Sequence, residues 1–157
     1  DEYHIRGFWG YTQLVYEEYF SYNPPRMKIT LPDEQIKGNF LLCSIANSSE
    51  FGNGFCISPK SNVVDGQMEL VLLSKFSWWR TMGVISRFFF KKIEGSRYIR
   101  IIPFQKARII LEVPLAHYDG EPFEVRKEIN LEIVPSSLSV LCGKAYLDFV
   151  HLKLKTE

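Results

Sequence analysis

Short apolar runs, separated by turn-forming residues, constrain the fold of this chain more than any other feature of its sequence. The runs are rich in Val, Ile, Leu and Phe, and Gly, Pro, Asn, Asp or Ser stand between them. Such runs favour strands, and several short strands at close spacing are typical of an all-β sandwich or barrel. The predicted strands are Met27–Leu31, Phe40–Ala46, Phe55–Ile57, Gln67–Leu73, Tyr98–Phe104, Ala107–Val113, Phe123–Arg126, Asn130–Val134 and Ser137–Leu141.

Two segments have helical character. One is Thr12–Phe20, and the other is Ser77–Lys92, where Ser77 can cap the N-terminus and two lysines suit the negative C-terminal end. The run Tyr146–Lys155 alternates apolar and polar residues, which indicates a strand with one wet face, a tail, or a return strand to a domain outside this sequence. The predicted fold class is therefore mainly β, a β-sandwich of antiparallel strands with one or two short helices.

Length and composition are those of one globular domain spanning residues 1–157. A chain of 157 residues can bury a continuous core without a metal or disulfide. It is 46% hydrophobic and 24% charged, with a formal net charge of +1. Such a balance creates no global field that would attract nucleic acid or an anionic membrane, so we expect no nucleic-acid partner and only local recognition.

Three cysteines lie far apart, at Cys43, Cys56 and Cys142, without a CxxC pair. This spacing favours buried free thiols in a reducing compartment over a disulfide framework or a zinc site. Neither a run of roughly 18 or more apolar residues nor a leader-like start is present in the sequence. We expect a soluble, cytoplasmic protein.

The segment Asn47–Leu70 concentrates glycines, a proline and an Asp-Gly pair between two predicted strands. Asp65-Gly66 alone is a strong hairpin signal. The alternative is a small metal-binding loop, because a carboxylate beside turn carbonyls offers the hard oxygen ligands that Mg²⁺ or Ca²⁺ prefers. From these residues alone, both interpretations stay open.

A second polar turn, His117–Phe123, contains Asp119, Gly120 and Glu121. Isolated turn residues of these types are usually solvated. A glutamate fixed just after such a turn can nevertheless act as general base on an alcohol if the hydroxyl comes within hydrogen-bond reach. Residue type permits this role without requiring it.

Read in order, these segments resemble the C-terminal half of the diacylglycerol kinase catalytic family, which includes bacterial lipid kinases and sphingosine and ceramide kinases. The resemblance covers about Gly7 to Cys142. It departs from the family at Asn53, where glycine is common, and at Met68-Glu69, which replaces Leu-Asp. The matching elements are Asn47, Gly52–Gly54, Ile57-Ser58-Pro59, Asp65-Gly66-Gln67-Met68-Glu69, Asp119-Gly120-Glu121 and Val134-Pro135-Ser136-Ser137-Leu138.

The resemblance implies a β-sandwich packed against an N-terminal α/β domain that binds ATP through a Gly-Gly-Asp-Gly-Thr loop, which this sequence lacks. Glu121 resembles the family's proton acceptor, which would take the proton of a lipid hydroxyl. Asp65 resembles the side-chain ligand of a structural Mg²⁺, to which Asn62 and Gln67 would add backbone carbonyls. The substrate implied is a diacylglycerol-like lipid, and the chain without its missing domain is expected to be inactive.

Two other functions are compatible with the sequence. The aromatic stretches Phe76–Trp79 and Phe88–Lys92 could belong to a noncatalytic module that binds lipid or protein, with peripheral contact at the inner face of the membrane, or could be helix core and interdomain surface. An NAD kinase-related phosphotransferase is the other alternative. A homodimer through the terminal strand also stays open.

Overall fold

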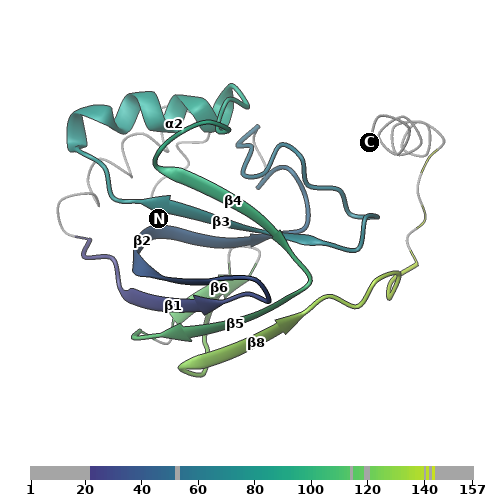
Figure 1. Cartoon of the computed structure of the whole chain (residues 1–157). Coiled ribbons are helices and arrows are strands. Elements are labelled where there is room, and N and C mark those ends of the chain that lie inside the picture. Colours follow the sequence, from purple (N-terminus) through teal and green to yellow (C-terminus); the bar gives the residue numbers. More distant parts are fainter. Residues whose placement is uncertain are drawn as a thin grey trace, which may run out of the picture.

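The computed structural model describes residues 22–51, 54–113, 115–118, 121–139, 141 and 143 (Figure 1). Within these residues the chain is built mainly of antiparallel strands with one short α-helix, which confirms the predicted fold class. The elements are β1 (Arg26–Thr30), β2 (Gln35–Ala46), β3 (Met68–Ser74), η1 (Trp78–Arg80), α2 (Thr81–Phe89), β4 (Ile99–Phe104), β5 (Lys106–Leu111), β6 (Leu115–Tyr118), β7 (Glu121–Glu124) and β8 (Glu128–Glu132).

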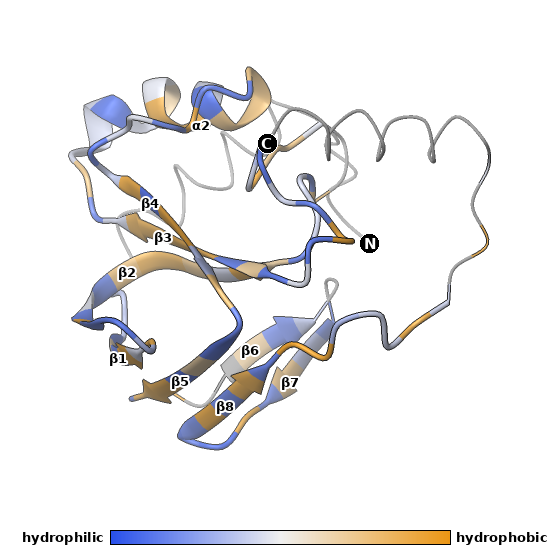
Figure 2. Ribbon diagram, turned by 45° about the vertical axis from the view of Figure 1, so that its right-hand side comes forward, coloured by the Kyte–Doolittle hydropathy of each residue, from blue (hydrophilic) through white to orange (hydrophobic). Residues whose placement is uncertain are grey.

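Six strands form one curled sheet in the order β4-β3-β2-β1-β5-β8, and β6 and β7 form a separate hairpin. The long strand β2 joins the two halves of the sheet, because Gln35–Asn39 pairs with β1 and Phe40–Ala46 pairs with β3. The register shifts between Phe40 and Leu42, where the ladder is irregular. A local irregularity of this kind bends and twists a strand. Figure 2 shows the resulting bend between the β3–β4 half and the β5–β8 half.

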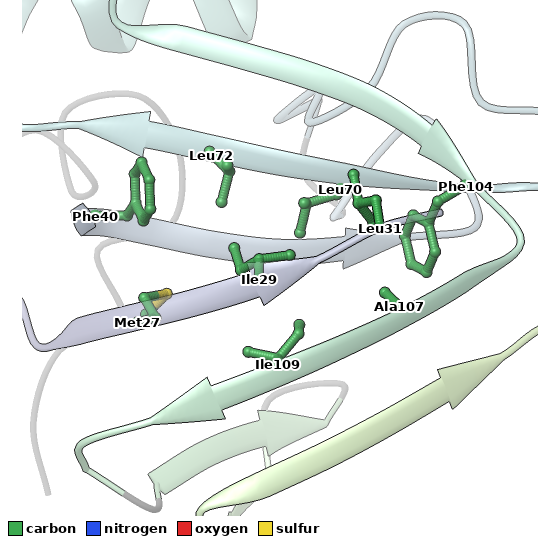
Figure 3. Close-up of a cluster of buried hydrophobic side chains, with 9 residues drawn as sticks. All are labelled: Met27, Ile29, Leu31, Phe40, Leu70, Leu72, Phe104, Ala107 and Ile109. Atoms are coloured by element: carbon green, nitrogen blue, oxygen red, sulfur yellow. The ribbon is translucent and has the colours of Figure 1, made fainter. Parts of the chain in front are cut away.

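The first core cluster fills the concave side between the two halves of the sheet (Figure 3). Side chains from β1, β2, β3, β4 and β5 contribute, so burial of this cluster holds both halves together. Its buried members are Met27, Ile29, Leu31, Phe40, Leu70, Leu72, Phe104, Ala107 and Ile109.

A second core cluster lies on the opposite face of β3 and β4 and is covered by α2. Successive side chains of a strand point to opposite faces, so Leu70 and Leu72 enter the first cluster while Val71 enters the second. From α2, Val84 and Phe88 pack against this face. Strand β3 is therefore buried on both sides, which explains its uninterrupted apolar run.

Seven of the nine predicted strands are confirmed, with ends shifted by a few residues. Phe55–Ile57 was predicted as a strand but contributes only an isolated bridge between Glu50 and Cys56. Its backbone bonds go elsewhere, from the Cys56 N–H to the Phe88 carbonyl and from the Ile57 N–H to the Ser49 carbonyl. The segment is apolar because it packs in the second cluster, not because it belongs to a sheet.

The last predicted strand, Ser137–Leu141, is wrong for residues 137–139 and 141, which the structure describes without strand. Leu138 and Leu141 are exposed, so no buried face supports their apolar character. Conversely, β6 is not among the predicted strands, because the predicted turn His117–Phe123 covers its second half. Paired with β7, this segment has strand geometry.

The predicted helix Ser77–Lys92 is shorter and divided. Ser77 precedes the 3-10 turn η1 without a side-chain cap bond, and Thr81 instead donates to the Trp78 carbonyl oxygen at 2.6 Å. The helix α2 ends at Phe89, and Lys91 has a positive φ of 55°, which is incompatible with continued α-helix. The predicted helix Thr12–Phe20 and the run Tyr146–Lys155 lie outside the described residues.

Two of the three cysteines are described, and both are free thiols. Cys56 is buried as predicted, whereas Cys43 is partly buried, and Cys142 lies outside the described residues. Burial raises the pKa of the Cys43 thiol to about 11 and also raises that of Cys56, so both stay protonated near neutral pH. Across the described ranges, no helix is long and apolar enough to cross a bilayer.

Candidate functional site

The loop before β3 brings the three predicted metal ligands together. The Asp65 Oδ1 atom accepts a hydrogen bond from the Gln67 N–H at 2.9 Å, and the Asn62 carbonyl oxygen accepts one from the Asp65 N–H at 3.3 Å. Between them Gly66 has a φ of 72°, a conformation that glycine adopts without a steric penalty. These bonds fix the loop and leave the Asp65 side chain exposed at the surface.

The donor chemistry of this loop fits a hard divalent cation. The Asn62 side-chain oxygen accepts from the Val64 N–H at 3.3 Å, and ligation by the backbone carbonyls of Asn62 and Gln67 stays a prediction. A carbonyl that already accepts one hydrogen bond keeps a second lone pair. In the described part of the chain, no group of three or more His, Cys, Asp or Glu side chains could hold a metal. A cation here would thus rely on one carboxylate, main-chain carbonyls and water, which suits Mg²⁺ or Ca²⁺ and not Zn²⁺.

A buried polar pair anchors the loop to the sheet. The Ser61 hydroxyl donates to Glu69 Oε2, and both residues are buried. Glu69 lies on β3, one residue before the apolar run Leu70–Leu73. An acidic residue beside such a run is the sequence signal that could have indicated a buried carboxyl group. Glu69 stands where the family that the sequence resembles has Asp. Burying a carboxyl group is costly unless it has a hydrogen-bond partner. We therefore infer that the bond between Ser61 and Glu69 holds the loop against β3.

Two contacts join this loop to segments far away in the sequence. The Gln105 side-chain amide donates to the Gly66 carbonyl oxygen at 3.4 Å. A Cβ atom placed on Gly66 would meet the Pro135 Cγ atom at 3.5 Å, so the Gly66 backbone lies directly beside that ring. The Asp65-Gly66 and Val134-Pro135 elements, both quoted for the family resemblance, are therefore neighbours in space.

Glu121 lies on the hairpin formed by β6 and β7. It is the first residue of β7, it pairs with Tyr118, and its side chain is exposed. The hairpin is inserted between β5 and β8, which pair with each other, and the Leu111 N–H donates to the Lys127 carbonyl at 2.8 Å where the hairpin begins. Glu121 therefore stands near the tip of a hairpin attached at the end of the β5–β8 ladder.

The structure thus gathers Asn62, Asp65 and Gln67 in one loop and places Glu121 on a separate two-stranded sheet. Asp119 and Gly120, between β6 and β7, lie outside the described residues. A surface groove of about 450 Å³ between the β1–β2 turn and the strands β5 and β8 contains none of the four predicted site residues.

Comparison with known proteins places the chain in a family. Residues 3–142 match the family described as YegS C-terminal NAD kinase beta sandwich-like domain. A probable lipid kinase YegS-like of Shewanella frigidimarina is 23% identical over 82% of this chain and 41% of its own length. A protein of the same name from Pseudomonas aeruginosa is 29% identical over 72% of this chain and 37% of its own length. The chain spans about two fifths of the length of these relatives.

Solved structures share the fold. A diacylglycerol kinase from Bacillus anthracis superposes with a TM-score of 0.63 over 89% of this chain and 51% of its own, at 15% identity. Another structure from the same organism gives 0.62 over 80% of this chain and 42% of its own, at 16% identity. The resemblance seen in the sequence is confirmed. The chain belongs to the family of YegS C-terminal NAD kinase beta sandwich-like domains.

Proposed function

We propose that this chain is the substrate-side domain of an ATP-dependent lipid kinase and that Glu121 is its general base. The observation that carries the proposal is the exposed Glu121 near the tip of an attached hairpin in a member of this family. The relatives named as lipid kinases are more than twice as long as the matched region. Their additional length leaves room for a nucleotide-binding domain that would face the hairpin.

In the proposed reaction, the hydroxyl oxygen of a diacylglycerol-like lipid attacks the γ-phosphorus of ATP. A new P–O bond forms, the bond from the γ-phosphorus to the β–γ bridging oxygen breaks, and ADP leaves. Glu121 accepts the hydroxyl proton as the oxygen becomes bonded to phosphorus. The Glu121 side chain is exposed, so a substrate hydroxyl can approach it to within hydrogen-bond reach.

The loop at Asp65 has a structural role in this proposal. The Asp65 carboxylate and the main-chain carbonyls of Asn62 and Gln67 would hold Mg²⁺. The positive charge of the ion would stabilise a loop in which these oxygens point toward one another. The chain's own contribution is to fix those oxygens through the Ser61–Glu69 pair and the Gly66 turn.

The test is phosphoryl transfer from labelled ATP to diacylglycerol by the intact protein that contains this chain. We expect Glu121→Gln to lower kcat by about 10²–10⁴-fold, the range for loss of a general base. Glu124→Gln is the matched control, because Glu124 is also exposed on β7 but projects to the opposite face. The free energy of unfolding should be equal in both variants.

Equal activity of the two variants would show that Glu121 is not the general base. If the unsubstituted intact protein labels no lipid, the kinase assignment is overturned. The 157-residue chain alone should transfer no phosphate. NAD belongs in the acceptor panel, because the family description likens its sandwich to that of NAD kinase. Labelling of NAD in place of lipid would support that second candidate.

A further inference from the structure

The segment formed by η1, α2 and the C-cap residue Phe90 exposes four large apolar side chains. Trp78 is 47% exposed, Trp79 66%, Met82 44% and Phe90 71%. These four residues, three aromatic side chains and one methionine, are called the aromatic face below. The buried residues Val84 and Phe88 of α2 pack in the second core cluster. The segment therefore exposes large apolar side chains to water, where a surface helix normally presents polar residues.

The aromatic face belongs to a basic region of the chain. Residues 75–97 contain six basic side chains and one acidic side chain, a formal charge of +5, although the whole chain carries +1. The remaining residues therefore carry −4. The one acidic residue, Glu94, forms an ion pair with Lys60 at 3.3 Å, whereas Lys91 of the segment forms an ion pair with Glu50 at 2.7 Å.

Two of the basic side chains lie next to one aromatic ring beside the helix. The guanidinium carbon of Arg97 lies 4.8 Å from the centroid of the Tyr98 ring, and that of Arg80 lies 5.9 Å from it. Lys75 and Lys92 are also exposed, just before η1 and just after α2. Positive charge therefore flanks the aromatic face on both sides.

This combination selects one kind of partner. Tryptophan is enriched at the interface between lipid and water, and basic residues are attracted to anionic headgroups. An apolar face bordered by basic residues is the arrangement with which short amphipathic helices lie on bilayers. Figures 1 and 2 show α2 along the outside of the β3–β4 half of the sheet.

We propose that η1 and α2 form a docking surface for an anionic phospholipid bilayer. The proposal does not depend on Glu121 or on phosphoryl transfer, because it rests on the exposure of the aromatic face and the charge around it. On docking, the two tryptophans enter the headgroup region while the flanking arginines and lysines contact lipid phosphates.

The test is co-sedimentation of the protein with vesicles of phosphatidylcholine containing about 30% phosphatidylglycerol, compared with phosphatidylcholine alone. We expect binding to the anionic vesicles, weakened about tenfold or more by Trp78→Ala combined with Trp79→Ala, from the loss of two buried aromatic groups. Arg80→Gln combined with Lys92→Gln should weaken binding about fivefold for each charge removed, and high salt should have the same direction of effect.

Matched controls separate this surface from general charge and hydrophobicity. Arg126→Gln with Lys127→Gln removes the same charge from the exposed β7–β8 connection, and Val134→Ala with Leu138→Ala removes exposed apolar groups elsewhere. Both should leave binding unchanged. The proposal is overturned if the parent does not bind anionic vesicles, as expected if another part of a longer protein covers this surface. It is equally overturned if the control variants lose as much binding as the aromatic and basic variants.

Discussion

Substitution of Gly66 by alanine is a quantitative test of the loop that carries Asp65. Gly66 has a φ of 72°, and an L-residue in this left-handed region costs about 1–2 kcal/mol. The new Cβ would meet Pro135 at 3.5 Å, an ordinary contact, so no steric cost is added. Replacement of glycine also restricts the unfolded chain, which returns about 0.4–1 kcal/mol. The net expectation is a loss of about 1 kcal/mol.

The matched control is Gly83→Ala in α2, which should change stability in the opposite direction. Nothing lies within 4 Å of a Cβ at Gly83, and the residue is helical, so alanine should stabilise by about 0.5–1 kcal/mol. Urea unfolding with unchanged m-values measures both effects. Gly66→Asn should lose less than Gly66→Ala, because asparagine tolerates the left-handed region. A Gly66→Ala protein at least as stable as the parent would refute the assigned turn.

Two further predictions concern charge. Mg²⁺ at one hundred times its Kd should raise the free energy of unfolding of the unsubstituted protein by about 2.7 kcal/mol. This gain should disappear in Asp65→Asn and persist in the control Asp33→Asn. Unfolding with and without Mg²⁺ measures both effects. The Arg108 guanidinium lowers the pKa of Glu128 below its ordinary 4.5 through a hydrogen bond at 2.7 Å. The stabilisation is therefore present above pH about 4.5 and is lost as pH falls through the folded pKa, so parent and Arg108→Gln should converge in stability in acid. A constant difference at all pH values would contradict this.

The strands could be predicted from sequence wherever burial and local preference agree. In β3 the apolar run is continuous because both faces are buried, and in β5 the buried Ala107 and Ile109 belong to the predicted apolar run Ala107–Val113. The prediction failed at Phe55–Ile57, where apolar character arises from packing under α2. Such packing depends on residues distant in sequence, which no local pattern displays.

The candidate site divides in the same way. Asp65 and Gly66 were predicted as a turn with possible ligands, and their local hydrogen bonds are short-range contacts that sequence can suggest. The Ser61–Glu69 pair and the contact between Gly66 and Pro135 depend on how β3 and the segment after β8 come together. Sequence spacing alone therefore could not reveal what holds the loop in place.

The curled sheet carries the three proposed functional surfaces at separate places. The hairpin with Glu121 is attached where β5 and β8 end, the Asp65 loop leads into β3, and the aromatic face lies on the segment that covers β3 and β4. Substitutions at sites that share no partner add in their effects on stability. Loss of phosphoryl transfer, of Mg²⁺-dependent stabilisation and of vesicle binding should therefore be separable by single-site variants. Such separation requires the rigid sheet, since a hairpin or loop of this size is not stable on its own.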